Sequence, residues 1–181
     1  LRVFMLSRLT LTVLLTFLSV FAVAANPDPA KLDLASVSVM IKDMDSGEVL
    51  YQRNPNLVQP VASITKLMTA LVALDAGQPA KERIPVSVED VPIMHNVHSR
   101  IRIGSEMPRG DALHLALMAS ENRAAATLGH SYPGGMNAFI NNMNLTAKGL
   151  SMESTRFVEP TGLSSENVSS AADLMRLIEV A

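Results

Sequence analysis

The chain of 181 residues carries 15 Lys and Arg against 17 Asp and Glu, a formal net charge of -2, and 48% of its residues are hydrophobic. This length and composition suit one globular domain with an ordinary core. Because the charges balance and no basic stripe alternates with aromatic residues, we expect no nucleic-acid partner. The absence of cysteine excludes disulfides and thiol catalysis.

The N-terminal segment is typical of a secretory signal peptide. Arg2 and Arg8 flank the start of an apolar run over residues 9–23, which ends in small side chains. We predict a signal peptide over residues 1–25 and a polar, proline-containing linker over residues 26–34. The protein is then expected in the periplasm, with membrane contact only through the signal segment during export. An uncleaved N-terminal anchor is the alternative, and it also places the rest of the chain outside the cytoplasm.

Residues 35–181 are expected to form the folded domain. Apolar and polar residues alternate over residues 37–42, a second short strand is expected over residues 48–53, and Asp-Ser-Gly at 45–47 supplies the turn between them. This pattern predicts a β-hairpin.

Helical periodicity predicts five helices, over residues 62–76, 111–119, 123–128, 136–148 and 170–181. The first is apolar on nearly every side, so the core should surround it, and Gly77 is placed to end it. Ser170 is expected to cap the last helix, with Asp173 completing a capping box.

Lys66 is the only charged residue between Asn54 and Leu74, and it lies in the most apolar helix. Burial disfavours the ammonium, so a neutral amine that acts as a base is expected there. Ser63 precedes it by one helical turn, within reach of that amine, and unpaired backbone N–H groups at the helix start could stabilise an oxyanion. The alternative is that Ser63 only caps the helix and Lys66 extends its charge to the surface.

Four segments carry a family resemblance. Residues 60–69, Pro-Val-Ala-Ser-Ile-Thr-Lys-Leu-Met-Thr, resemble the active-site helix of low-molecular-mass penicillin-binding proteins. Residues 115–125 resemble the Ser-x-Asn element of that family. Tyr-Pro-Gly-Gly at 132–135 and Glu-Pro-Thr-Gly-Leu at 159–163 are similar to segments of its D-alanyl-D-alanine endopeptidase branch.

The resemblance implies an α+β fold of the β-lactamase and DD-peptidase type, with a helical lobe and an antiparallel sheet. It implies that Ser63 attacks a D-Ala carbonyl, that Lys66 takes the proton and that Ser120 helps to deliver one to the leaving amine. Asn122 would hold a substrate peptide bond. The implied partners are peptidoglycan stem peptides and β-lactam antibiotics, and neither a metal nor an organic cofactor is required.

The Ser-x-Asn element also makes chemical sense without the family. In a non-helical connection, side chains two residues apart point to the same side, so Ser120 and Asn122 could face one cleft. The tripeptide Ser-Glu-Asn recurs at 165–167, and this second copy is assigned to a turn before the last helix.

The third element of the family, a Lys-Thr-Gly on a late strand, has no match in the 181 residues. The hairpin would also lack the later strands of the sheet as neighbours. We therefore expect a chain truncated at its C-terminus, which on its own is poorly folded or inactive.

Three alternatives remain open. A class A β-lactamase shares the Ser-x-x-Lys helix and uses a glutamate to activate water; Glu159 fits that role, but Glu121 stands where the class has Asp. A non-catalytic remnant or binding protein is the second. A zinc hydrolase is the third, but the histidines lack the His-Glu-x-x-His pattern: His95, His98, His114 and His130.

Overall fold

The computed structural model describes residues 31–94 and 97–181. The chain divides into two units, residues 1–34 and 35–181, and the account below concerns the second. The predicted signal peptide lies outside the described residues, and the predicted linker is described only from Lys31 onward.

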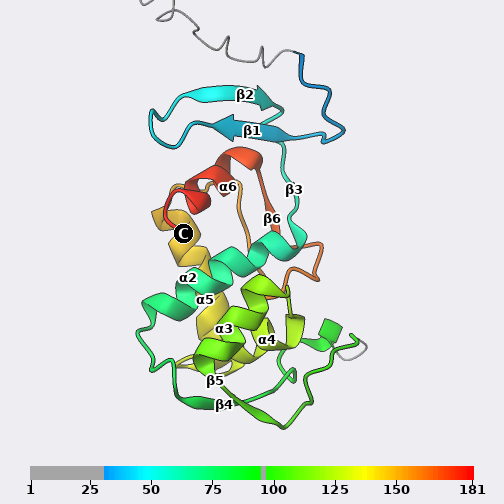
Figure 1. The fold of residues 1–181 in the computed structure, drawn as a ribbon, viewed down its shortest axis with the longest axis vertical. Coiled ribbons are helices and arrows are strands. Elements are labelled where there is room, and N and C mark those ends of the chain that lie inside the picture. The colour runs from blue at the N-terminus through cyan, green and yellow to red at the C-terminus, as the bar shows by residue number, and fades with distance from the viewer. Residues whose placement is uncertain (1–30, 95–96) are drawn as a thin grey trace, which may run out of the picture. The chain divides into compact units, whose positions relative to one another are not determined.

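The second unit combines helices with short antiparallel strands, so the fold is α+β as predicted (Figure 1). Its elements in chain order are β1 (Val39–Lys42), β2 (Val49–Arg53), β3 (Gln59–Pro60), the 3-10 turn η2 (Ala62–Ile64), α2 (Thr65–Asp75), β4 (Arg83–Pro85), η3 (Pro92–Met94), β5 (Glu106–Pro108), α3 (Arg109–Met118), α4 (Asn122–His130), α5 (Gly135–Gly149), β6 (Val168–Ser169) and α6 (Ala171–Ile178).

Strands β1 and β2 form the predicted hairpin, with Val39 opposite Arg53. The turn is organised by Asp43, whose carboxylate accepts hydrogen bonds from the backbone of Asp45 at 3.0 Å and of Ser46 at 2.7 Å. The Ser46 backbone N–H is the main cause that lowers the pKa of the Asp43 carboxyl. Such Asx turns explain why short polar residues join the two strands.

The hairpin is only partly covered within the described residues. Helix α6 packs against β1, and Lys42 on β1 pairs with Glu179 just after α6. Several apolar side chains of the hairpin region are nevertheless between 37% and 58% exposed: Val37, Ile41, Val49 and Leu50.

Two further strand pairs were not predicted. Strand β3 pairs with β6, with Gln59 opposite Ser169, and β4 pairs with β5, with Ile84 opposite Met107. These strands have two or three residues each, too few to show an alternating pattern in the sequence. The β3–β6 pair brings residues 167–169 beside the start of η2.

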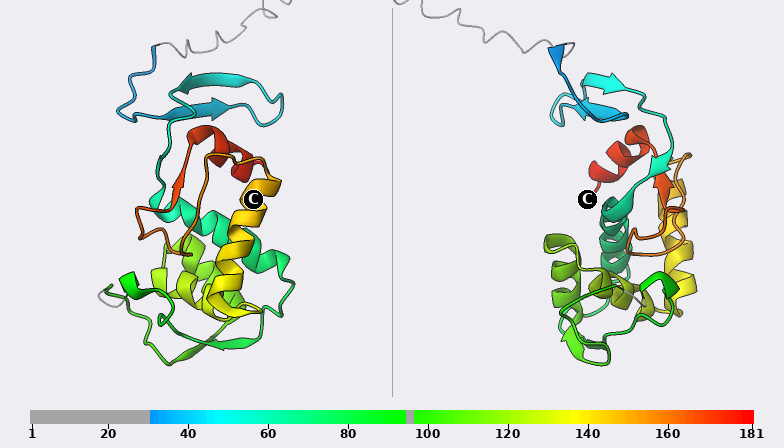
Figure 2. Two further views of the ribbon diagram at one scale, coloured as in Figure 1. Left: turned by 180° about the vertical axis from the view of Figure 1, so that it is seen from behind. Right: turned by 90° about the vertical axis from the view of Figure 1, so that its right-hand side faces the viewer.

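Helix α2 lies at the centre of the unit, as its apolar sequence predicted. It contacts the other four α-helices of the described residues, α3, α4, α5 and α6 (Figures 1 and 2). Met68 is fully buried and Val72 is 2% exposed, so the core surrounds this helix. Gly77 ends it at a φ of 61°, the left-handed conformation expected of a C-terminal glycine. The first predicted turn differs, because residues 62–64 form a 3-10 turn rather than α-helix.

The other predicted helices are present with shifted ends. Helix α3 begins two residues before the predicted start, α4 is longer at both ends, and α6 ends at Ile178 rather than at Ala181. On α5, Phe139 and Met143 are fully buried. No helix among the described residues is long and apolar enough to span a membrane.

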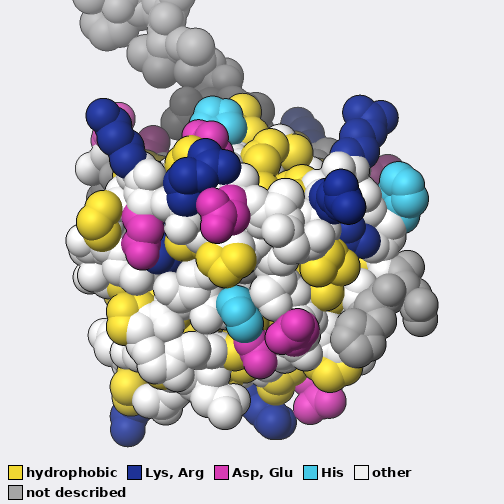
Figure 3. All heavy atoms as spheres, turned by 90° about the horizontal axis from the view of Figure 1, so that it is seen from below, with side chains coloured by type: hydrophobic (Ala, Val, Ile, Leu, Met, Phe, Trp, Pro, Cys, Tyr) yellow, Lys and Arg dark blue, Asp and Glu magenta, His cyan; other side chains and the backbone are white. Residues whose placement is uncertain are grey.

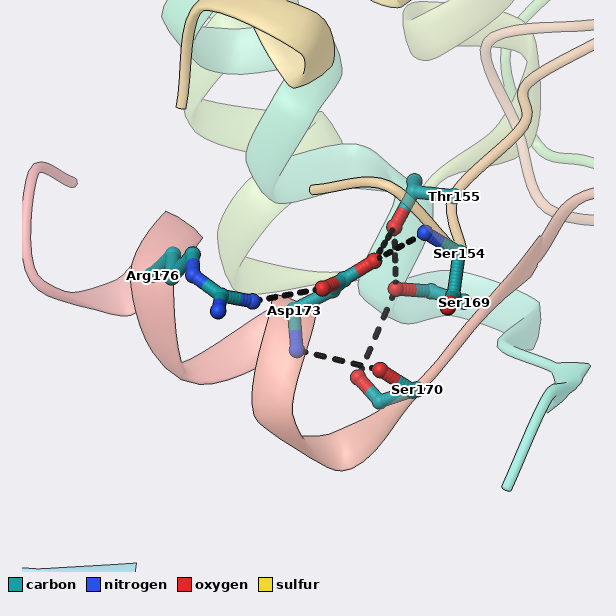
Figure 4. A network of polar contacts seen from close by, with 6 residues as sticks. All are labelled: Ser154, Thr155, Ser169, Ser170, Asp173 and Arg176. Atoms are coloured by element: carbon teal, nitrogen blue, oxygen red, sulfur yellow. Dashed lines mark hydrogen bonds and ion pairs between the residues drawn. The ribbon is translucent and has the colours of Figure 1, made fainter. Parts of the chain in front are cut away.

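The start of α6 carries half of the predicted capping box. The Ser170 side chain accepts a hydrogen bond from the Asp173 backbone at 3.2 Å, as expected of an N-cap. The Asp173 carboxylate does not return to Ser170 but accepts from the backbone of Ser154 and the hydroxyl of Thr155, each at 2.8 Å (Figure 4). The Arg176 guanidinium donates to the Asp173 Oδ1 at 2.6 Å. We call these residues the α6 network: Ser154, Thr155, Ser169, Ser170, Asp173 and Arg176.

The face seen from below in Figure 1 carries a mixture of side chains. Acidic, basic and hydrophobic groups are interspersed on it rather than gathered by type (Figure 3). This distribution agrees with the near-balanced charge of the sequence.

Candidate active site

The structure brings Ser63 and Lys66 together. Ser63 lies in η2 and Lys66 in the first turn of α2, and the Lys66 Nζ is 3.1 Å from the Ser63 Oγ. This distance is within the range required for proton transfer between a nucleophile and its base. Ser63 is exposed, whereas Lys66 is 2% exposed. The alternative in which Lys66 extends its charge to the surface is therefore wrong.

Burial lowers the pKa of the Lys66 ammonium, because the charged form loses its hydration. The carboxylates of Glu159 and Glu121 act in the opposite direction and raise this pKa. The effect of burial is the larger one, so the neutral amine is favoured relative to a lysine in water. A neutral amine beside an exposed hydroxyl is the arrangement that general-base catalysis requires.

A second hydrogen bond sets the direction of the amine. The Lys66 Nζ donates to the backbone carbonyl oxygen of Thr161 at 2.7 Å. On the next turn of α2, the Thr69 hydroxyl donates to the Pro160 carbonyl at 2.7 Å. These two bonds attach the loop at residues 159–164 to the face of α2 that carries Lys66.

The same loop touches the residue before the nucleophile. Gly162 has a φ of 83°, and a Cβ added there would lie 1.9 Å from the carbonyl oxygen of Ala62. Ala62 itself has a φ of 44°, which is strained for a residue with a side chain. The backbone around Ser63 is thus held in a sparsely populated conformation by direct contact with the loop.

The loop is organised around the carboxylate of Glu159, which is 6% exposed. Oε2 accepts from the backbone of Thr161 at 2.6 Å and from its hydroxyl at 2.5 Å. Oε1 accepts from the backbone of Gly162 at 2.7 Å and of Ser164 at 3.3 Å, and from the side chain of Asn167 at 2.9 Å. A carboxylate offers about four lone-pair positions, so these five donors leave none for a water molecule.

Asn167 connects the loop to α2 and to β3. Its amide donates to the Thr65 hydroxyl at 3.1 Å, and its side-chain oxygen accepts from the Val158 backbone at 2.8 Å. Its own carbonyl accepts from the backbone of Val61 at 3.0 Å. The predicted turn at Ser165 and Glu166 is present, but Asn167 is fully buried and has a positioning role that the sequence did not reveal. We call the following residues the loop network: Thr65, Glu159, Thr161, Gly162, Ser164 and Asn167.

Ser120 and Asn122 lie in and just after the connection between α3 and α4. Ser120 is exposed and has a φ of 51°, while Asn122 is half-buried. Contrary to the prediction of a non-helical connection for both, Asn122 is the first residue of α4. This helix extends further because Glu121 caps it, accepting from the backbone of Ala124 at 2.9 Å. Among the described residues neither Ser120 nor Asn122 makes a side-chain hydrogen bond.

The connection is linked to Lys66 by charge rather than by a direct bond. Glu121, between the two predicted site residues, is close enough to raise the pKa of Lys66. Ser120 and Asn122, which flank Glu121 in the sequence, remain predicted site residues.

The histidines do not come together within the described residues. His114 lies on α3, and His130 at the end of α4 has its Nδ1 2.5 Å from Asp90. In residues 31–94 and 97–181 no group of three or more potential ligands could hold a metal ion. His95 lies outside the described residues.

Similar solved structures include a penicillin-binding protein and a D-alanyl-D-alanine carboxypeptidase. A cefotaxime-bound penicillin-binding protein D2 from Listeria monocytogenes superposes with a TM-score of 0.71 at 31% identity, over 82% of this chain and 62% of that one. A D-alanyl-D-alanine carboxypeptidase from Mycobacterium tuberculosis gives 0.71 at 32% identity, over 81% and 55%. The fold and the serine–lysine pair thus define the class of penicillin-binding serine peptidases.

The family follows from the sequence match. The family model described as D-alanyl-D-alanine carboxypeptidase, peptidase S11, matches residues 22–181. The chain therefore belongs to this family.

Two curated relatives are named D-alanyl-D-alanine endopeptidase. One from Pseudomonas aeruginosa is 52% identical over 176 residues, which are 94% of this chain and 57% of the relative. One from Escherichia coli is 54% identical over 155 residues, 86% and 50% respectively. The chain spans about half the length of these relatives.

Proposed function

We propose that the protein is a serine peptidase that cleaves D-alanyl bonds in peptidoglycan stem-peptide cross-links through an acyl-enzyme. The observation that carries this proposal is the 3.1 Å contact between the Ser63 hydroxyl and the buried Lys66 amine. Family membership and the endopeptidase names of the two curated relatives support the substrate class.

In this mechanism the Ser63 Oγ attacks the D-Ala carbonyl carbon while its proton passes to the neutral Lys66 amine. The carbon–nitrogen bond of the tetrahedral intermediate then breaks, and the leaving amine takes a proton delivered with the help of Ser120. Water hydrolyses the ester and restores the Ser63 hydroxyl. Asn122 is proposed to hold the substrate peptide bond during both steps.

A β-lactam would acylate the same serine, because the Ser63 Oγ attacks the lactam carbonyl and the lactam carbon–nitrogen bond breaks, leaving an ester that carries the opened ring. The cefotaxime-bound and ampicillin-bound structures of the Listeria protein support this proposal. We also propose that the protein acts in the periplasm, supported by the signal-like segment over residues 1–25.

Catalysis by Glu159 as in a class A β-lactamase is disfavoured. That role requires a carboxylate with a free lone pair for water, and all the lone pairs of Glu159 are engaged within its own loop. We therefore expect slow rather than rapid hydrolysis of penicillin.

The proposal also limits what these 181 residues do alone. They contain no Lys-Thr-Gly, which the family resemblance assigns to binding of the substrate carboxylate. The serine–lysine pair is present in these residues, and we propose that acylation at full rate needs a Lys-Thr-Gly as well. A reading frame that continues beyond codon 181 to a Lys-Thr-Gly would supply it.

The test is labelling with a fluorescent penicillin, using the full chain that the gene encodes. Mass spectrometry of the labelled peptides should place the penicilloyl ester on Ser63, and Ser63→Ala should abolish it. Ser165→Ala is the matched control, because Ser165 is an exposed serine of the second Ser-Glu-Asn and should leave labelling unchanged. Label on another residue, or its persistence in Ser63→Ala, would overturn the proposal.

A further inference from the structure

The inference concerns Glu159 and rests on the proposed function of Ser63 and Lys66. Its buried carboxylate has no ion pair with a lysine, arginine or histidine of the described part of the chain. A buried charge is costly unless its surroundings compensate it. Here the compensation consists of the hydrogen-bond donors of the loop and of the nearby Lys66.

The donors to Glu159 fix one particular carbonyl. Both the N–H and the hydroxyl of Thr161 point to Oε2, and the N–H of Gly162 points to Oε1. The peptide group between these two residues is thereby held from both sides. Its oxygen is the one that accepts from the Lys66 Nζ at 2.7 Å.

This carbonyl decides where the amine lone pair points. A neutral lysine amine has two hydrogens and one lone pair. If one hydrogen donates to the Thr161 oxygen, the lone pair can turn toward the Ser63 hydroxyl, which is 3.1 Å away. Without the carbonyl the amine rotates freely, and fewer of its orientations can accept the serine proton.

We propose that Glu159 is a positioning residue for the Ser63–Lys66 pair, acting through the Thr161 carbonyl that it holds in place. It does not touch the reacting atoms. Its carboxylate selects the amine orientation that can accept a proton and adds a negative charge near that amine.

The negative charge of Glu159 allows a second measurement, the pKa of Lys66, which does not depend on the acylation rate. The groups that act on Lys66 are the Ser63 hydroxyl from η2, Glu121 from the α3–α4 connection, and the Thr161 carbonyl and Glu159 from the loop. Glu159 raises the pKa of Lys66. Removing its charge must therefore lower that pKa, and loss of the Thr161 acceptor acts in the same direction.

The test compares Glu159→Gln with Glu166→Gln in the full chain that the gene encodes. Both replace a glutamate of the same segment with its amide. Glu166, however, is exposed, and its ion pair with Arg156 is long, at 3.9 Å. The pKa of Lys66 is measured by NMR of ¹³C-labelled lysine, and penicillin acylation is measured across pH. Glu159→Gln should lower the NMR midpoint, move the acidic limb of the acylation profile to lower pH and reduce its plateau about 10-fold or more. Glu166→Gln should match the wild type.

A folded Glu159→Gln protein with the wild-type midpoint and plateau would overturn the proposal. If this variant does not fold, Glu159→Asp provides the test, since it keeps the charge but is one methylene too short to reach the same donors. It should lose plateau rate and lower the midpoint less than Glu159→Gln does, because the negative charge remains. A wild-type plateau would count against the proposal. The NMR titration needs no acylation. A wild type that fails to acylate would therefore refute the proposed peptidase function, while the titration would still test the positioning role of Glu159.

Discussion

Two buried carboxylates, Glu159 before β6 in the sequence and Asp173 after it, differ in their partners. Glu159 and Asp173 are 6% and 4% exposed, and each accepts backbone and hydroxyl hydrogen bonds. Asp173 is paired with Arg176, whose side chain is 44% exposed, so its charge is neutralised at the surface. Among the described residues Glu159 has no ion pair; its carboxylate accepts from donors of the loop network and lies near Lys66. The same chemical group therefore accepts hydrogen bonds at the start of a helix in the α6 network and, in our proposal, positions the Ser63–Lys66 pair from the loop network.

The largest effect is expected from the contact between Gly162 and Ala62. In Gly162→Ala the new Cβ would meet the Ala62 oxygen at 1.9 Å, so the loop and the residue before Ser63 must move apart. We expect penicillin acylation to fall by about 100-fold, since a displacement of about 1 Å has that effect in active sites.

Gly77→Ala is the control for backbone strain alone. Gly77 also has a positive φ, but nothing lies within 4 Å of an added Cβ. It should cost about 1 kcal/mol of unfolding free energy and leave the acylation rate unchanged. Equal acylation rates in the two variants would mean that the loop does not hold Ser63.

Asn167 is the next strongest test. Asn167→Ala leaves the backbone N–H of Val158 and the hydroxyl of Thr65 without their buried partner. We expect a loss of about 2 kcal/mol of unfolding free energy, measured by urea denaturation, together with slower acylation.

Ser170→Ala in the α6 network removes a helix cap and should cost about 1 kcal/mol of unfolding free energy, with no change in the acylation rate. A Ser170 variant with slower acylation would show that the two networks are not independent.

Asp173→Asn makes the same change from carboxylate to amide in the α6 network as Glu159→Gln makes in the loop network. Its bonds to Arg176, Ser154 and Thr155 weaken, and we expect a loss of about 1.5 kcal/mol of unfolding free energy. The acylation rate of the folded protein and the pKa of Lys66 should not change. A shift in either one would assign the α6 network a part in the site.

The smallest expected effect is a dependence of stability on pH. The pKa of Lys66 is lowered in the folded protein, whereas the unfolded chain keeps a value near 10.5. Between these two values the unfolded state binds more protons, so the unfolding free energy rises with pH, and this gain is absent below the folded-state pKa. Urea midpoints at several pH values should show the rise in the wild type and not in Lys66→Met. Parallel curves for the two proteins would contradict the lowered pKa.

The sequence was sufficient for the elements that have long, regular patterns. The apolar run over residues 62–76 predicted a central helix, and a single charge inside it predicted that Lys66 is buried beside Ser63. The hairpin followed from alternation and a turn. Each of these features depends on residues close together in the sequence.

What the sequence did not reveal depends on contacts between distant segments. The bond from Lys66 to Thr161 joins residues 95 positions apart, and that from Asn167 to Thr65 joins residues 102 apart. Strands β3 and β6 are too short for a periodic pattern, so nothing local indicated that the loop lies against α2. The one available clue was the Glu-Pro-Thr-Gly sequence, whose glycine suggested an unusual backbone but not its contact with Ala62.

The acceptor that orients Lys66 belongs to the main chain, and this affects which mutations the site can tolerate. No exchange of the side chain at position 161 removes a backbone oxygen, so the acceptor itself is not encoded by any single residue type. Substitution at position 161 removes the hydroxyl bonds to Glu159 and from the Leu163 backbone, whereas substitution at 159, 162 or 167 alters the path of the chain. A replacement of similar size at the buried Thr161 should therefore disturb the acceptor less than substitutions at the residues that hold Thr161 in place.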